Sequence, residues 1–302
     1  MLAGNTNDER EGRITTETRP SGAVRIAAIL AVAYLIAMTM NAQSTMAWQS
    51  QKQSTGRLDS AAVPEPRIDA NSMFAHQQLL AKARTGRIDL YFLGDSITRR
   101  WGCTDPQWSE MLANWKKNFF GWNAANFGWG GDRIQNILWR IENGELDNVN
   151  PKVIVILAGT NNVGNVPGDD AKVADIVSGI RALIDACHRK APHAKIILTA
   201  IFPRNDNLAV LPEIRKINKR IANFADGQTV FYLNINTKLA NAHGLLLDGM
   251  TVDKLHLSVK GYQIWADNLR PMLATFLGPP AKTDHAPAPT GDPSATHPAA
   301  GS

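Results

Sequence analysis

The chain has 302 residues, of which 44% are hydrophobic and 20% are charged, so it is neither fully disordered nor short of material for a buried core. Its two cysteines, Cys103 and Cys187, are too few for a disulfide scaffold or a four-cysteine zinc site. The formal net charge of +5 raises the question of an anionic partner.

The N-terminal region contains an uncharged apolar run, Ile26–Met40, directly after Arg25. A membrane-spanning helix usually needs about 20 apolar residues, so this run suits the hydrophobic part of a secretory signal peptide better. Residues 1–42 therefore predict export to the periplasm or the extracellular space. A retained membrane anchor is the alternative, because residues 26–51 carry no charge.

Two further segments differ in composition from the centre of the chain. Residues 43–70 are polar and irregular, and they predict a linker. Residues 279–302 are rich in Pro, Ala and Thr, and they predict a disordered tail that cannot form a core. The predicted folded unit is residues 71–278, a size that suits a single domain.

Within this unit, short β-rich apolar runs alternate with helical patterns. The predicted strands are 88–93, 124–127, 152–157, 195–200 and 229–233. The predicted helices are 134–141, 171–190, 212–224 and 259–277. Three of the strands are almost continuous Val, Ile and Leu, which is typical of strands buried on both faces. The alternation predicts an α/β fold with a central parallel sheet, whose ligands bind at the carboxyl ends of the strands.

A serine follows the first predicted strand, in the block Gly94-Asp95-Ser96. A serine at a strand-to-helix turn is presented at the edge of the sheet, near the free N–H groups of the helix. Read alone, the block is more typical of an ordinary helix N-cap. The G-x-S-x-G elbow of the α/β-hydrolases is excluded, because residue 98 is threonine.

Two possible oxyanion donors follow the next two strands. The glycine-rich stretch Asn126–Asp132 lacks the dinucleotide fingerprint, because Arg133 stands where a glycine is needed. Its Gly131 can bring a backbone N–H close to a reacting oxygen, although a plain turn explains it about as well. Asn161 is either a turn residue or an amide donor to an oxyanion.

Five of the seven histidines lie in the tail, before the first strand or beside the end of a helix, which leaves His243 and His256. Of these two, only His256, which follows the last strand, has a carboxylate three residues before it, at Asp253. With Ser96 these residues supply the parts of an acyl transfer: a nucleophile, a base that takes its proton, and an acid that orients the base. Backbone N–H groups of Ser96 and Gly131 and the amide of Asn161 would hold the oxyanion.

Four blocks in this order resemble those of the SGNH (GDSL) hydrolase family. The blocks are Gly94-Asp95-Ser96, Asn126–Asp132, Gly159–Asn162 and Asp253-x-x-His256. The likeness extends over about residues 85–278. It is greatest to the catalytic subunits of intracellular platelet-activating-factor acetylhydrolase, to which NFGWGGDRIQNILWRIENGEL and NPKVIVILAGTNN are similar.

The resemblance implies a three-layer α/β/α flavodoxin-like fold, no cofactor, and a homodimer as a candidate assembly. It implies Ser96 as nucleophile, Asp253 and His256 as the rest of the triad, and Gly131 and Asn161 as oxyanion donors. The chain departs from the family in having isoleucine after the serine, where leucine is usual, and in its predicted export signal and proline-rich tail.

The substrate prediction depends on bulky neighbours of the motif residues. Ile97, Trp129 and Leu255 would suit a small acyl pocket, such as one for acetyl, while core packing is the alternative reading and is at least as good for Trp101. Because an exported esterase meets acetylated glycans, we expect deacetylation of carbohydrates or other small acylated compounds. A lysophospholipase or platelet-activating-factor-like acetylhydrolase is the alternative.

Other function classes find less support in the sequence. A silent binding module would be favoured by a missing triad residue, and none is missing. No His/Asp cluster has the spacing of metal ligands, so no metal is expected. Residues 1–42 hold four Arg and four acids, so the net charge outside them is still +5. No Lys/Arg-rich run of five occurs there, and we expect a diffuse surface charge and no nucleic-acid binding.

Overall fold

The structure is a computed structural model that describes residues 60–295. The predicted signal peptide or anchor at residues 1–42, and residues 43–59 of the predicted linker, lie outside the described residues. Within residues 60–295, none of the helices combines the length and the apolar character that a membrane span requires.

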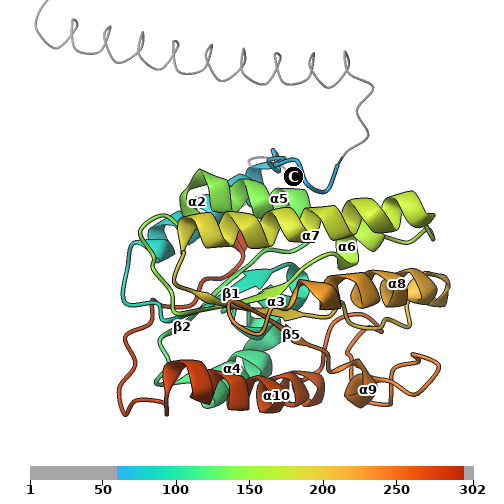
Figure 1. Cartoon of the computed structure of the whole chain (residues 1–302). Coiled ribbons are helices and arrows are strands. Elements are labelled where there is room, and N and C mark those ends of the chain that lie inside the picture. The colour runs from blue at the N-terminus through green and yellow to red at the C-terminus, as the bar shows by residue number, and fades with distance from the viewer. Residues whose placement is uncertain (1–59, 296–302) are drawn as a thin grey trace, which may run out of the picture. The chain divides into compact units, whose positions relative to one another are not determined.

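The centre of the domain is a sheet of five parallel strands in the order β2-β1-β3-β4-β5 (Figure 1). The strands are β1 Leu90–Gly94, β2 Ala124–Gly128, β3 Val153–Leu157, β4 Lys195–Thr199 and β5 Val230–Leu233. This is the strand order of the flavodoxin-like fold, with its topological switch point between β1 and β3. All five predicted strands are therefore confirmed, and no end differs by more than two residues.

Helices cover both faces of the sheet. The helices are α2 Ala70–Ala83, α3 Ser96–Trp101, α4 Ser109–Phe119, α5 Ile134–Arg140, α6 Thr160–Val163, α7 Asp170–Lys190, α8 Leu211–Ile221, α9 Asn236–Leu239 and α10 Val259–Leu277. A π-helical turn, Ile141–Glu145, continues α5, and 3₁₀ turns lie at Pro106–Trp108, Leu208–Val210, Ala222–Phe224 and Pro293–Ala295. In Figure 1, α2, α5 and α7 lie above the sheet and α4 and α10 lie below it, which confirms the three-layer prediction.

Two hydrophobic cores fill the spaces between the layers. Tyr91 and Leu93 belong to the core on the side of α5, α7 and α8, whereas Leu90 and Phe92 belong to the core on the side of α4 and α10. Successive residues of a strand point to opposite faces, so a strand between two helical layers must be apolar at every position. This is why the central strands appear in the sequence as continuous apolar runs.

The predicted disordered tail is wrong for residues 279–295, which we call the C-terminal strap. Its His285 carbonyl accepts from the Arg87 backbone N–H at 2.7 Å, and its Asp284 carboxylate accepts from the Gly121 N–H at 2.6 Å. The strap lacks apolar residues for a core, but hydrogen bonds to the domain backbone order it.

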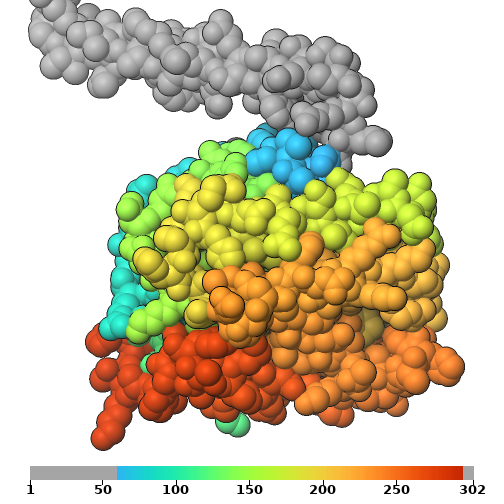
Figure 2. Space-filling model, in the orientation of Figure 1, coloured from blue at the N-terminus to red at the C-terminus, as the bar shows by residue number. Residues whose placement is uncertain are grey.

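The predicted linker also ends earlier than residue 70. Ser60 donates its hydroxyl to Asp175 on α7 at 2.9 Å, and Ala61 is fully buried against Gly179 of the same helix. Glu65 donates its backbone N–H to the Gln135 carbonyl at 3.0 Å. Residues 60–70 therefore belong to the folded domain, because these contacts attach them to α5 and α7 (Figure 2).

Candidate active site

Ser96 is the first residue of α3, and only Asp95 separates it from the end of β1, at the switch point of the sheet. The buried Asp95 caps this helix by accepting the Ile97 N–H at 2.9 Å. Trp101 fixes the other end of α3, because its ring is fully buried and stacks on Tyr262 and Trp265 of α10 at 4.9 and 5.0 Å. The serine is thus presented by a short helix that is held at both ends.

A continuous hydrogen-bonded chain joins the three predicted catalytic residues. Ser96 Oγ lies 2.9 Å from His256 Nε2, and His256 Nδ1 lies 2.7 Å from Asp253 Oδ2. The structure therefore brings together all three residues that the sequence selects, although Ser96 and His256 are 160 residues apart.

A tight turn between β5 and α10 holds the acid and the base together. Asp253 Oδ1 accepts the backbone N–H groups of His256 at 2.7 Å and of Leu255 at 3.2 Å. Lys254, between them, has a φ of 68°, the left-handed conformation that such a turn requires. Val252 donates its N–H to the His256 carbonyl at 2.9 Å, which closes the turn. The ring and the carboxylate are therefore oriented before any substrate binds.

Burial and the charge of Arg100 favour the neutral form of His256. Partial burial raises the pKa of Asp253, but hydrogen bonds from His256 and Arg100 outweigh it and lower this pKa to about 2. Burial lowers the pKa of His256, and the Arg100 charge lowers it further, against the opposing effect of Asp253 and Asp206. At neutral pH the imidazole can thus donate from Nδ1 to Asp253 and accept the Ser96 proton at Nε2.

The two predicted oxyanion donors lie in loops that are bonded to each other. Gly131, with a φ of 78°, is in the loop after β2, and Asn161 is in α6, which follows β3. Asn161 Nδ2 donates to the Asp132 carbonyl at 2.8 Å, and the neighbouring Asn162 Oδ1 accepts the Ile134 N–H at 2.9 Å. These bonds hold the two loops together at the carboxyl edge of the sheet.

The model of the GDSL-like lipase/acylhydrolase family matches residues 92–264, which is more than half of the chain. The chain belongs to this family. It is accordingly a carboxylic ester hydrolase, as the sequence blocks predict.

The chain is similar in sequence to subunits of platelet-activating factor acetylhydrolase IB. The alpha1 subunit of Bos taurus is 28% identical over 211 residues, which cover 69% of this chain and 85% of the relative. The alpha2 subunit of Rattus norvegicus is 30% identical over 215 residues, which cover 69% and 88%. A solved GDSL-like lipase from Bacteroides thetaiotaomicron has a TM-score of 0.51 at 20% identity, covers 62% of this chain and 88% of its own, and shows the same fold.

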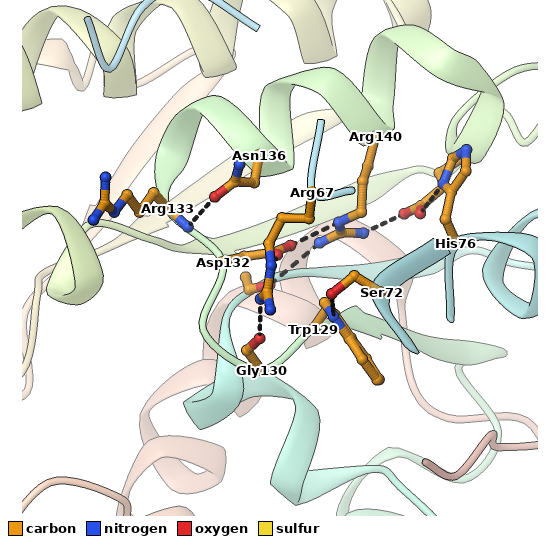
Figure 3. Close-up of polar contacts among 12 residues, drawn as sticks. Arg67, Ser72, His76, Trp129, Gly130, Asp132, Arg133, Asn136 and Arg140 are labelled. Atoms are coloured by element: carbon orange, nitrogen blue, oxygen red, sulfur yellow. Dashed lines mark hydrogen bonds and ion pairs between the residues drawn. The ribbon is translucent and has the colours of Figure 1, made fainter. Parts of the chain in front are cut away.

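The structure also reveals a buried charged cluster behind the glycine-rich loop, which the sequence analysis missed (Figure 3). Arg140 Nε donates to Asp132 Oδ2 at 2.8 Å, and its Nη1 is bonded to Glu145. His76 Nδ1 lies 2.8 Å from the other oxygen of Glu145. The available signal is Arg140, the one charged residue of the predicted helix 134–141.

Arg67, in the segment predicted as a linker, is bonded to the same loop. Its Nη1 donates to the Gly130 carbonyl at 2.6 Å and lies 3.7 Å from Asp132 Oδ1 (Figure 3). The Gly130 carbonyl and the Gly131 N–H belong to one planar peptide unit and point in opposite directions. Arg67 therefore fixes the direction in which the Gly131 N–H points.

The three predicted pocket residues differ in what they expose. Ile97 is only 2% exposed and belongs to the core beneath the sheet, so it offers almost no surface to a substrate. Trp129 is 7% exposed, and its Nε1 donates to Ser72 Oγ at 2.9 Å. Leu255, next to His256, is half-buried. The packing interpretation therefore describes Ile97 and Trp129 better than the pocket interpretation.

Proposed function

We propose that the chain is a serine esterase that cleaves short-chain, acetyl-type esters of carbohydrates or other small acylated compounds. The observation that carries the proposal is the continuous chain of hydrogen bonds from Ser96 Oγ through His256 to Asp253. The same arrangement serves nucleophilic acyl transfer on unrelated folds.

In the proposed reaction, Ser96 Oγ attacks the ester carbonyl carbon while His256 Nε2 takes the serine proton. The N–H groups of Ser96 and Gly131 and the Asn161 amide hold the tetrahedral oxyanion. His256 then gives the proton to the leaving alcohol, which departs and leaves the acyl group on Ser96. Water, activated by His256, releases the acid and restores the serine. Asp253 stays ionised throughout and stabilises the imidazolium.

Leu255 and the predicted export favour a small acyl group on a glycan. Leu255 directly precedes His256 in the chain and has part of its surface free, and we place the acyl or alcohol portion of an ester against it. We propose, from residues 1–42, that the protein is exported, and acylated polymers are accessible to an exported enzyme. The named relatives favour a second candidate, a platelet-activating-factor-like acetylhydrolase activity.

Chain-length selectivity tests the substrate, and a serine variant tests the mechanism. We expect kcat/KM for p-nitrophenyl acetate to exceed that for the octanoate at least about tenfold, because even one extra methylene can change discrimination by a pocket about tenfold or more. We also expect release of acetate from acetylated xylan. Preference for octanoate would overturn the acetyl proposal, and release of acetate from platelet-activating factor but not from xylan would select the second candidate.

Ser96→Ala should lower kcat at least about 10³-fold with the circular dichroism spectrum unchanged. Ser178→Ala, at an exposed position of α7, is the matched control and should keep full activity. Full activity in Ser96→Ala would refute the proposed mechanism.

A further inference from the structure

Arg100 lies one helical turn after Ser96, on the same short helix, and contacts the triad from outside. Its Nη1 donates to Asp253 Oδ2 at 3.0 Å. This is the same carboxylate oxygen that accepts from His256 Nδ1 at 2.7 Å. Helix α3 therefore carries both the nucleophile and a cation that bonds to the acid of the triad.

The guanidinium of Arg100 is itself held in place. Its Cζ lies 4.3 Å from the centroid of the Trp108 ring, and the side chain is only 20% exposed. With Arg100 in position, both oxygens of Asp253 have two donors each: the Leu255 and His256 backbone N–H groups on Oδ1, and the His256 ring and Arg100 on Oδ2. The carboxylate is thus fully bonded and fixed in rotation.

This ion pair has little value for stability but a clear value for the reaction. The Asp253 side chain is 43% exposed, and such surface pairs contribute little to folding. The charged groups acting on His256 are Asp253 on its own turn, Asp206 in the loop after β4, and Arg100 on α3. Asp206 is already paired with Arg204, its Oδ1 accepting at 2.6 Å, so Arg100 is the cation that opposes protonation of the ring.

We propose that Arg100 is a positioning residue: its guanidinium holds the Asp253 carboxylate against His256 and keeps His256 unprotonated, and so it sets the lower pH limit of the esterase reaction. The inference rests on the proposed function, because it assigns Arg100 a role only if His256 is the base. A fixed positive charge beside the acid–base pair lowers the proton affinity of the base, as nearby like charges do in general. The acidic limb of the pH profile of kcat/KM reports the pKa of the catalytic base in the free enzyme.

The test is the pH profile of kcat/KM for p-nitrophenyl acetate in wild type, Arg100→Gln and Arg100→Lys. In Arg100→Gln, which removes the charge, we expect the acidic limb to move up by about 0.5 to 1 pH unit, and the plateau to fall by less than about tenfold. In Arg100→Lys, which keeps the charge, the limb should stay within about 0.2 pH unit of wild type.

Arg189→Gln is the matched control, because it removes the same charge from a 62% exposed arginine that pairs with Glu142. Its acidic limb should be that of wild type. An unchanged limb in a folded Arg100→Gln variant would overturn the proposal, as would equal shifts in Arg100→Gln and Arg100→Lys. Full activity in Ser96→Ala would instead show that the proposed function itself has failed.

Discussion

The Asn161 side chain is oriented by one hydrogen bond and has a second N–H to give. Its Nδ2 donates to the Asp132 carbonyl at 2.8 Å, and an amide nitrogen carries two hydrogens. Asp132 is in turn fixed by Arg140, whose Nε donates to it at 2.8 Å. A donor that is already oriented needs no reorganisation when charge develops on the substrate oxygen, which is why such donors are effective.

We therefore expect Asn161→Ala to lower kcat by about 10²–10³-fold with little change in KM, because one oxyanion donor typically contributes that much. The measurement is steady-state kinetics on p-nitrophenyl acetate. Asn143→Ala is the control, since Asn143 is exposed and bonds only to the Trp139 carbonyl among its described partners. A kcat within about threefold of wild type would contradict the assignment of Asn161.

For single residues, the sequence predicts the site residues that follow strands and misses the residues that hold those site residues in place. Ser96, Gly131, Asn161 and His256 are predictable because the carboxyl ends of parallel strands share one edge. The role of Arg67 is not predictable, because it depends on a bond to the Gly130 carbonyl, and a backbone group leaves no pattern in the sequence.

Helix α3 is the element on which the site depends, and it begins at a buried acid. Asp95 is fully buried, and its Oδ1 caps the helix by accepting the Ile97 N–H. Burial, together with the nearby charge of Asp132, raises the pKa of Asp95 to about 7. Gly128 of β2 packs closely against this helix. Any side chain at position 128 would clash with it, because a Cβ there would lie 2.5 Å from the Arg99 backbone nitrogen.

Asp95→Asn should change how stability depends on pH. Because the folded pKa of Asp95 is raised above its ordinary 3.8, the stability it contributes is fully present below 3.8 and is lost as the pH rises through about 7. Asparagine keeps the cap and cannot ionise. We expect the variant to melt roughly 3 °C or more above wild type at pH 8, an advantage that shrinks towards pH 4.

Thermal unfolding followed by circular dichroism at pH 4, 6 and 8 measures this difference. Asp170→Asn, at an exposed acid of α7 that pairs with Lys216, provides the control for charge alone. A stability difference that does not vary between pH 4 and 8 would show that folding does not raise the pKa of Asp95.

The helices differ from one another in how well the sequence predicts them. The predicted helices at 171–190 and 259–277 match α7 and α10 closely, because their apolar residues recur at helical spacing. Helices α2 and α4 are missing from the prediction. Lys82 of α2 is buried and donates to the Asn126 carbonyl, while Asn114 and Asn118 of α4 are buried in hydrogen bonds to Gln263. Polar residues on the buried face conceal the apolar repeat.

Segments from both ends of the described chain are hydrogen-bonded to the rest of the domain. Arg67 precedes α2 and bonds to the glycine-rich loop, while Asp292 of the C-terminal strap accepts from Asn71 at 2.9 Å and donates its N–H to Asp105 at the same distance. Composition assigns both segments to a linker or a tail, because it counts apolar residues and not backbone hydrogen bonds. The domain is therefore larger than the apolar pattern predicts.

The central claim is that Ser96 forms a covalent acyl intermediate. The most direct measurement is rapid acid quenching of the full-length protein during turnover of p-nitrophenyl acetate, followed by tryptic digestion and mass spectrometry of the peptide Ile88–Arg99. We predict one added acetyl group, located on Ser96, and none on this peptide in Ser96→Ala. Steady turnover with an unmodified Ser96 and acetyl on another residue would contradict the account.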